Sequence, residues 1–312
     1  MSGEQLHTAI DSELRRAVPA PVTELAEQLA RRGGEHTVAV LFYGSALRGA
    51  ALEGVLDYYV LLDRVSAWDG SRVAAFANRL LPPNVGYFEG QVAGAPLRAK
   101  YAVLSLQQFR DGMSAKALDT TLWARFSQPC ACVWSRSTAD REAVVDAVSG
   151  AVVTAARWAA ELGPSSAVAT GFWRALFART YGAELRVERS VRSSDIVDRD
   201  AERYTSMLPP AWSLAGIDFE TSGDGQLTPR LNPAARRSAA RRWAWRQRLG
   251  KPLNLLRLLK AAFTFDGAMD YVAWKVERHS GVRIEVAPWQ RRFPLLAAPG
   301  LYWRLRRRGV LR

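Results

Sequence analysis

The chain reads LFYGSALRG over residues 41–49 and LDYYVLL over residues 56–62. The first stretch opens as an apolar run typical of a buried strand and reaches Gly44-Ser45, a dipeptide that favours a turn. The second stretch is another apolar run, with one acidic residue, Asp57, near its start. This pattern predicts a strand that ends at Gly44-Ser45, a short helix after it, and a second strand that presents a carboxylate at its beginning.

This layout suits phosphate chemistry. Backbone N–H groups and a hydroxyl at a helix start can hold phosphate oxygens, and a nearby carboxylate can bind Mg²⁺. Nucleotidyltransferases have the same layout, with Gly-Ser followed by two acids separated by one residue. Here Tyr59 takes the place of the second acid. The structural alternatives are an ordinary turn at Gly44-Ser45 and a strand-capping role for Asp57.

Apolar runs elsewhere predict the rest of the sheet. Strands are expected at residues 36–42, 55–62, 85–92, 97–104 and 129–134. A tight turn is expected at Gly94-Ala95-Pro96. Helices are expected at residues 4–16, 22–32, 106–113 and 117–126. Because helices separate some strands and direct turns join others, the predicted fold class is α/β, with a mixed sheet under helical cover.

The pattern becomes helical from Asp140 onward, which predicts a domain boundary near that residue. We expect an α/β domain, a helical domain, a linker rich in Gly and Pro, and a basic amphipathic helical region, at residues 1–140, 141–216, 217–233 and 234–312. In the last region the pattern predicts two helices, at 234–249 and 252–279. This region is expected to be separable from the Gly44 and Asp57 site, because that site lies in the first domain.

The net charge of +13 is unevenly distributed along the chain. Residues 230–312 hold 20 basic and four acidic residues, so they carry +16 and the rest of the chain carries −3. Trp243, Trp245, Trp289 and Trp303 interleave with these arginines. The composition is typical of a helix on an anionic lipid surface. Nucleic-acid binding through phosphate contacts and base stacking produces the same composition, so the residues alone leave both partners open.

Neither a secretory signal nor a spanning segment is expected. The first 16 residues carry Glu4, Asp11 and Glu13 and lack an apolar centre. The apolar runs are broken before the ~18–20 residues that cross a bilayer. Cys130 and Cys132 are expected in the core, since their spacing suits neither a disulfide nor a zinc site. A protein acting at a membrane would then lie on its surface.

Several short motifs share their order and spacing with one protein family. They are Tyr43-Gly44-Ser45-Ala46, Asp57-Tyr58-Tyr59-Val60, Val85-Gly86-Tyr87-Phe88, Lys100-Tyr101-Ala102-Val103, and residues 124–130, 181–186, 258–264 and 271–275. From about residue 20 to 280 the chain resembles the mitochondrial translocator assembly and maintenance type of phosphatidate cytidylyltransferase. That branch of the nucleotidyltransferases also has a single acid in its motif.

The resemblance implies a nucleotidyltransferase-like domain, a winged-helix-like second domain and a basic C-terminal helix used on membranes. The implied reaction joins CTP and phosphatidate to give CDP-diacylglycerol and pyrophosphate, with Mg²⁺. The implied roles are nucleotide binding for Tyr43, Gly44, Ser45, Arg48 and Arg125, metal binding for Asp57, phosphate neutralisation for Lys100, and substrate contact for Glu184 and Arg186.

The chain departs from the family pattern at a few positions. Gln128 replaces a lysine, which removes one phosphate contact, and Ala46 and Ala102 replace glycines. Glu89 stands where asparagine is usual, and it could supply a second metal carboxylate. Ordinary structural roles remain open for the same residues: Lys100 could extend its ammonium to the surface, Arg125 and Arg186 could pair with acids, and Glu89 could be a surface acid.

The expected protein is therefore a CTP:phosphatidate cytidylyltransferase, cytoplasmic and peripheral on the inner face of a membrane. Its nucleophile is already ionised, so positioning and charge neutralisation would do most of the catalysis. One alternative is a nucleotidyltransferase acting on RNA or protein. Another is a non-enzymatic membrane- or RNA-binding adaptor on the same fold. The resemblance favours lipid over nucleic acid as the partner.

Overall fold

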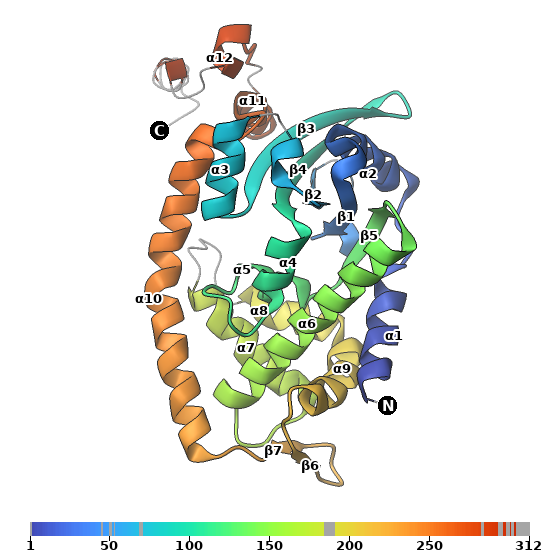
Figure 1. The fold of residues 1–312 in the computed structure, drawn as a ribbon, viewed down its shortest axis with the longest axis vertical. Coiled ribbons are helices and arrows are strands. Elements are labelled where there is room, and N and C mark those ends of the chain that lie inside the picture. The colour runs from blue at the N-terminus through green and yellow to red at the C-terminus, as the bar shows by residue number, and fades with distance from the viewer. Residues whose placement is uncertain are drawn as a thin grey trace. The chain divides into compact units, whose positions relative to one another are not determined.

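Five strands form one mixed sheet in the order β3-β4-β2-β1-β5 (Figure 1). They are β1 (Thr37–Tyr43), β2 (Val55–Leu62), β3 (Asn84–Val92), β4 (Ala95–Ser105) and β5 (Cys130–Ser135). The structure is a computed structural model, and it describes all residues except 1, 45, 50–51, 53, 69–70, 184–190, 282–283, 293–295, 298–299, 301–302 and 304–312. The predicted α/β class and mixed sheet are confirmed, and 61% of the structure is helical.

Antiparallel pairing joins β1 to β2 and β3 to β4. Strands β1 and β2 are buried along most of their length, as expected of apolar runs that are covered on both faces. The β3–β4 turn lies at Ala93-Gly94, one residue earlier than predicted, where both residues have positive φ (49° and 79°). Two residues with positive φ are what a two-residue hairpin turn requires.

Helices make up most of the remaining structure. The α-helices are α1 (Ser2–Leu14), α2 (Ala20–Gly33), α3 (Arg72–Leu80), α4 (Leu106–Met113), α5 (Thr121–Phe126), α6 (Thr138–Leu162), α7 (Ala169–Ala183), α8 (Val191–Arg199), α9 (Ala201–Leu214), α10 (Pro233–Thr264), α11 (Ala268–Ser280) and α12 (Pro288–Arg292). Short 3₁₀ helices are η1 (Gly34–His36), η2 (Ala46–Arg48) and η3 (Val65–Ala67).

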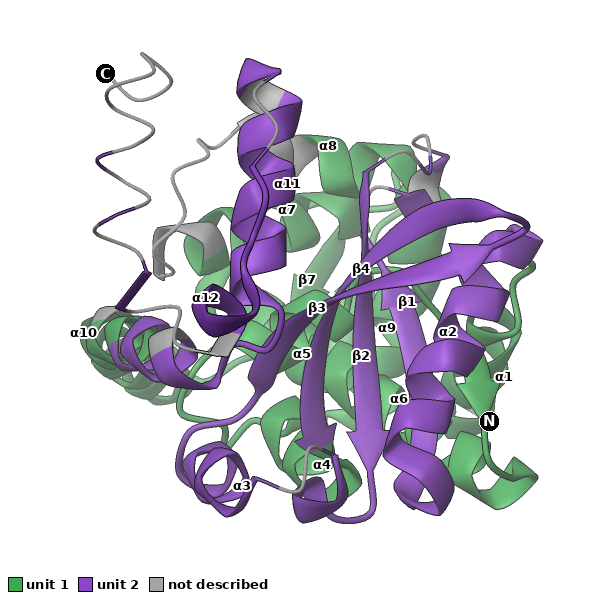
Figure 2. Cartoon of the chain, turned by 90° about the horizontal axis from the view of Figure 1, so that it is seen from above, with its two compact units in different colours: residues 1–17, 105–255 green, residues 18–104, 256–312 purple. Residues whose placement is uncertain are grey.

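The chain divides into two compact units, each made of two separate segments (Figure 2). Unit 1 comprises residues 1–17 and 105–255, and unit 2 comprises residues 18–104 and 256–312. The boundaries expected at residues 140, 216 and 233 all fall inside unit 1. Assigning nucleotidyltransferase-like and winged-helix-like domains to parts of these units remains a prediction.

Two expectations about the last third of the chain are wrong. The segment predicted as a linker contains a hairpin, β6 (Phe219–Thr221) paired with β7 (Leu227–Pro229). Helix α10 continues through Pro252, where a break was expected, and ends at Thr264. The break lies instead at residues 265–267, where the chain meets the edge of the sheet in unit 2, as described below.

Unit 1 has a core rich in tryptophan. Trp123, Trp158, Trp173 and Trp212 are fully buried. Helix α6 is the one helix in the described part of the chain that is long and apolar enough to cross a bilayer, contrary to the expectation that none would be. Since 67% of its most apolar window is buried inside the protein, its apolar character is accounted for by packing in the core.

In unit 2, helix α2 covers one face of the sheet. The hydroxyl of Tyr58 on β2 donates to the carbonyl oxygen of Val22 on α2 (2.9 Å). A Cβ built at Gly90 on β3 would lie 2.5 Å from a methyl group of Leu25. The absence of a side chain at Gly90 therefore allows α2 to pack closely against β3. The opposite face of these strands is the one that carries the candidate site.

Candidate functional site

Gly44 and Asp57 lie against each other where β1 ends and β2 begins. Tyr43 pairs with Asp57 across the two strands, so Gly44 is the first residue to leave the sheet. Gly44 has φ +101°, and a Cβ placed on it would lie 3.2 Å from Asp57 Oδ2. Glycine therefore permits both the backbone conformation and the close approach to the carboxylate. The predicted strand, short helix (η2) and second strand are confirmed around this turn.

Side-chain alternation places Asp57 on the sheet face away from α2. Because Tyr58 bonds to α2, its neighbour Asp57 points to the other face. On β4, the ring of Tyr101 lies 5.6 Å from the guanidinium carbon of Arg32, a residue of α2. Lys100 therefore also points away from α2. Since β2 and β4 are neighbours in the sheet, Asp57 and Lys100 share one face on adjacent strands.

Tyr87, Glu89 and Arg98 extend this face toward the sheet edge. Tyr87 pairs with Lys100, and Glu89 pairs with Arg98, across β3 and β4. Arg98 Nε lies 3.2 Å from Glu89 Oε2, and the Tyr87 hydroxyl donates to the same oxygen (3.2 Å). Burial, with the charge of Glu89, raises the pKa of Tyr87 well above its usual range, so Tyr87 remains a donor.

Glu89 does not lie close to Asp57 in this arrangement. Strand β4 lies between β3 and β2, so the two backbones are about 10 Å apart or more. Arg98 and Tyr87 engage its carboxylate, and metal binding would require Glu89 to exchange these partners. Across the described part of the chain, no three His, Cys, Asp or Glu side chains form a group that could hold a metal. The role of Glu89 as a second metal ligand remains a prediction.

A chain segment far away in the sequence docks on the edge of this sheet. The Tyr87 N–H donates to the Asp266 carbonyl oxygen (2.8 Å), and the Asp266 carboxylate accepts from Arg32 and from the Tyr101 hydroxyl, both at 2.6 Å. Gly267 follows with φ +69°, and a Cβ there would lie 2.5 Å from the Tyr87 carbonyl oxygen. These contacts explain why the helical pattern stops at Thr264 and restarts as α11.

Helix α11 then runs across the face that holds Asp57 and Lys100. Its residues Tyr271, Trp274 and Arg278 are spaced at i, i+3 and i+7, so they share one side of the helix. The Tyr271 ring lies 5.6 Å from that of Tyr87, and the Trp274 ring lies 5.8 Å from the guanidinium carbon of Arg98.

The far end of the same side of α11 reaches the start of β2. A Cβ built at Gly54 would lie 3.7 Å from Arg278 Nη1, three residues before Asp57. Figure 2 shows that α11, α2 and strands β1–β4 all belong to unit 2, and that α11 and α2 lie on different sides of these strands. Sequence reasoning missed this role for α11, although the aromatic and basic residues at helical spacing were a usable signal. Residues 234–312 were expected to be separable from the site; residues 256–312 fall in the same compact unit as the site, whereas residues 234–255 fall in unit 1.

The other predicted site residues lie in different parts of the chain, and some lie outside the described residues. Arg125 is half-buried on α5 and belongs to unit 1. Arg48 lies in η2, close in sequence to Gly44. Ser45, Glu184 and Arg186 lie outside the described residues, as does the side chain of Arg48. The structure therefore places Tyr43, Gly44 and Asp57 at the junction of β1 and β2, Lys100 on the neighbouring strand β4, and Glu89 one strand further away on β3.

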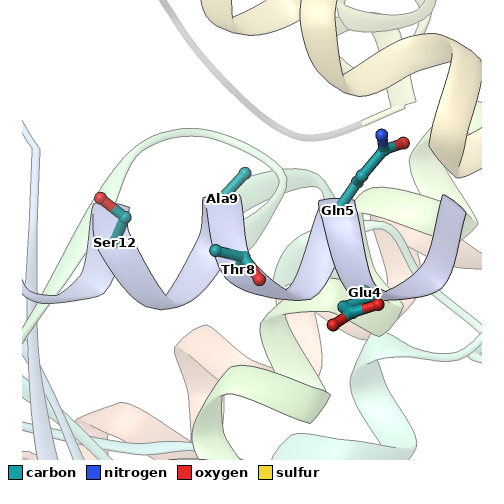
Figure 3. A pocket seen from close by; sticks show the side chains of 5 residues that line it. All are labelled: Glu4, Gln5, Thr8, Ala9 and Ser12. Carbon is teal, nitrogen blue, oxygen red and sulfur yellow. The ribbon is translucent and has the colours of Figure 1, made fainter. Parts of the chain in front are cut away.

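Two surface hollows lie elsewhere, in unit 1. One is lined only by α1 residues, and its Glu4 and Gln5 side chains point in different directions (Figure 3). The other is lined by Ser213, Ile217, Asp218, Phe219 and Arg230. Neither includes a predicted site residue, and neither brings together a nucleophile and a base.

The face of unit 2 combines a carboxylate beside a glycine turn with the cationic side chains of Arg98, Lys100 and Arg278, and Lys275 Nζ lies 6.0 Å from the ring of Tyr271 on the same helix. Such a surface can bind a phosphate chain through charge-assisted hydrogen bonds, with Asp57 available for a divalent cation. No protein-family model matches this chain, and no curated protein matches it.

Proposed function

We propose that the protein is a phosphatidate cytidylyltransferase, which transfers CMP from CTP to phosphatidate and releases pyrophosphate. The observation that carries this proposal is the placement of Asp57 and Lys100 on one sheet face beside the Gly44 turn. The family resemblance of the same motifs supplies the substrate classes.

The donor set fits Mg²⁺, which is usually held by one or two carboxylates together with substrate phosphates and water. Asp57 would hold the ion, and the ion would offset charge on the triphosphate. The Gly44 turn would place backbone groups against the phosphates. Lys100 would lie beside the same phosphates and stabilise the charge that develops on pyrophosphate as it leaves. The lipid phosphate oxygen forms the new bond to the α-phosphorus while the bond to pyrophosphate breaks.

Exposed apolar side chains in unit 2 support an anionic membrane surface as the partner. On α3, Val73, Phe76 and Leu80 recur on one side and are 76%, 64% and 68% exposed. On α10, Leu256, Leu259 and Phe263 are also exposed. Lys260 and Arg257 tie this part of α10 to the segment that joins α3 to β3 through hydrogen bonds to carbonyl oxygens of residues 81–83. Apolar side chains next to basic ones are the composition of an interfacial surface.

The test is cytidylyl transfer to phosphatidate in mixed micelles, with radiolabelled nucleotides compared side by side. Asp57→Asn should reduce turnover at least about 100-fold and leave the thermal midpoint nearly unchanged, because one carboxylate oxygen is replaced without a change of shape. Asp63→Asn is the matched control, since Asp63 follows the other end of β2 and pairs with His36 (3.0 Å). If Asp57→Asn retained more than a tenth of wild-type activity, Asp57 would be excluded from the site.

The same assay examines the alternatives. The alternatives are a non-enzymatic membrane- or RNA-binding adaptor and a nucleotidyltransferase that acts on RNA or protein. An adaptor would bind vesicles or RNA and transfer no label to any acceptor. Transfer of label to RNA or to protein, with none to phosphatidate, would instead favour the other nucleotidyltransferase activities.

A further inference from the structure

We infer that Arg98 and Arg278, held on the ring of Trp274, form a phosphate-binding subsite on the face that carries Asp57 and Lys100. The inference deepens the proposed function and rests on it for the identity of the substrates. The residues come from a strand and a helix that are more than 170 positions apart in sequence.

Two guanidinium groups share one indole ring. The guanidinium carbon of Arg278 lies 5.3 Å from the Trp274 ring centroid, and that of Arg98 lies 5.8 Å from it. Cation–π contact holds both groups in place and leaves their charge and most of their N–H donors available.

Among the described residues named on this face, cationic side chains outnumber carboxylates. Glu89 pairs with Arg98, and Asp57 lies beside Gly44. Against these two carboxylates stand Arg98, Lys100 and Arg278. The Arg98 side chain is 24% exposed and Arg278 is exposed, so both can reach a ligand. Phosphate is the anion that suits two fixed guanidinium groups, through bidentate charge-assisted hydrogen bonds.

Arg278 lies near the start of β2, where a bound phosphate would come close to Asp57. Its Nη1 is 3.7 Å from the Cβ position of Gly54, just before the strand that carries Asp57. A phosphate held there would lie at the same end of β2 as the Asp57 carboxylate. The ligand is therefore a phosphate ester, and its source is either the triphosphate of the nucleotide or the phosphomonoester of the lipid.

The experiment measures binding in the full-length protein without turnover. Calorimetric titrations with pyrophosphate and with CTP are compared with sedimentation on vesicles that contain phosphatidate or phosphatidylglycerol. The variants are Arg98→Gln and Arg278→Gln, each with its lysine counterpart. Arg291→Gln is the matched control, because Arg291 is in the same unit and its Nε pairs with the Asp270 carboxylate (3.0 Å).

Each glutamine variant should weaken pyrophosphate, CTP or phosphatidate binding by about tenfold or more, as expected for loss of a charged hydrogen bond. Arg291→Gln should stay within about twofold, in line with an exposed surface change. The lysine variants retain the charge and should recover part of the affinity, which separates ligand binding from a purely structural role. Loss restricted to CTP and pyrophosphate identifies the nucleotide as the source, and loss restricted to phosphatidate vesicles identifies the lipid.

Wild-type affinity for all three ligands in both glutamine variants would overturn the subsite, as would the absence of phosphate binding by the wild-type protein. These outcomes are distinct from failure of the proposed function. If Asp57→Asn abolishes transfer while the arginine variants bind normally, the function stands and the subsite fails. If the wild-type protein transfers no cytidylyl group but the arginine variants lose pyrophosphate binding, the subsite stands and the function fails.

Discussion

At the scale of single residues, one ion pair in unit 1 is almost fully shielded from solvent. Arg203 donates to Glu13 Oε1 (3.2 Å) and to the Ser127 carbonyl oxygen (2.9 Å), and the two charged side chains are 10% and 5% exposed. Glu13 comes from α1 and Arg203 from α9. The pair therefore links distant parts of unit 1 by charge in an environment where an unpaired charge is costly.

Glu13→Gln should lower the free energy of unfolding by about 3–5 kcal/mol, because the guanidinium would remain buried without its counter-charge. Urea denaturation followed by circular dichroism gives this value. Glu27→Gln serves as the control, since Glu27 is an exposed helix residue whose ion pair with Arg31 spans 3.7 Å. A loss below about 1 kcal/mol in Glu13→Gln would show that the pair is no more stabilising than a surface pair.

Lys260 provides a prediction about pH. Its Nζ donates to Leu81 O (2.6 Å), Pro83 O (2.5 Å) and Asn84 Oδ1 (3.0 Å). Burial, with the nearby charge of Arg257, lowers the pKa of Lys260 to about 8. The unfolded chain keeps this proton up to about pH 10.4, so between these values it binds more protons than the folded protein.

The contribution of Lys260 to stability should therefore rise with pH above about 8, and the cost of burying its charge should be present in full below that pH. The neutral amine still donates two hydrogens to the surrounding oxygens. The measurement is the difference in unfolding free energy between the wild-type protein and Lys260→Met from pH 7 to pH 10. The difference should move in favour of the wild type as pH rises. A difference that stays constant would contradict the lowered pKa.

At the scale of secondary-structure elements, the placement of α11 depends on Gly267. An alanine there would meet the Tyr87 carbonyl oxygen and would also have to adopt φ +69°. Gly281, at the other end of α11, has φ +70° but nothing within 4 Å of its Cβ position. Comparing alanine substitutions at the two glycines therefore separates the cost of backbone strain from the cost of a steric clash.

Gly281→Ala should cost about 1–2 kcal/mol of stability from strain alone. Gly267→Ala should cost more and should also expose the Tyr87 amide to hydrogen exchange, since the Tyr87 N–H bonds to Asp266. Amide exchange by mass spectrometry measures this effect. Equal protection of residue 87 in both variants would mean that α11 does not depend on the Gly267 contact.

The elements were largely predictable because apolar periodicity is a local signal. The runs at 55–62, 85–92 and 97–104 correspond to β2, β3 and β4 within about two residues. The docking of Asp266 on the edge of the sheet was not predictable, because the side chains that its carboxylate binds, Arg32 and Tyr101, lie 234 and 165 residues away. The continuation of α10 through Pro252 was missed for a similar reason, since a local helix-breaking signal was overridden in the folded chain.

The candidate site, too, was predictable from sequence only in part. The Gly44 turn and the Asp57 carboxylate follow from one continuous motif, so sequence and structure agree on them. The role of α11 requires knowing that Trp274 lies over Arg98, and no spacing rule connects a strand to a helix so distant along the chain. The resemblance implied that the basic helix around residues 271–275 is used on membranes, and in the structure Tyr271 and Trp274 contact the sheet.

At the scale of the whole molecule, the exposed apolar residues of α3 and α10 predict how the protein meets a bilayer. Phe76→Ser and Phe263→Ser should each weaken sedimentation with anionic vesicles, most clearly at high salt, where charge attraction is screened and apolar insertion remains. Leu118→Ser is the control, because Leu118 is 66% exposed but belongs to unit 1. RNA binding at the same ionic strength is measured in parallel. Tight RNA binding without vesicle association would contradict the lipid surface.

The construction of unit 2 from two segments that are far apart in the sequence also sets the order in which the protein can mature. Arg32 leaves the ribosome 234 residues before its partner Asp266. At about 5–20 residues per second, that interval is about 10–50 s. Strand β3 ends at Val92, 174 residues before Asp266, so for about 9–35 s at the same rate its edge is open and its N–H and C=O groups can pair with other chains. A nascent chain of this protein would therefore need protection at β3 until residue 266 has been translated, and the candidate site would be assembled only after α11 has emerged.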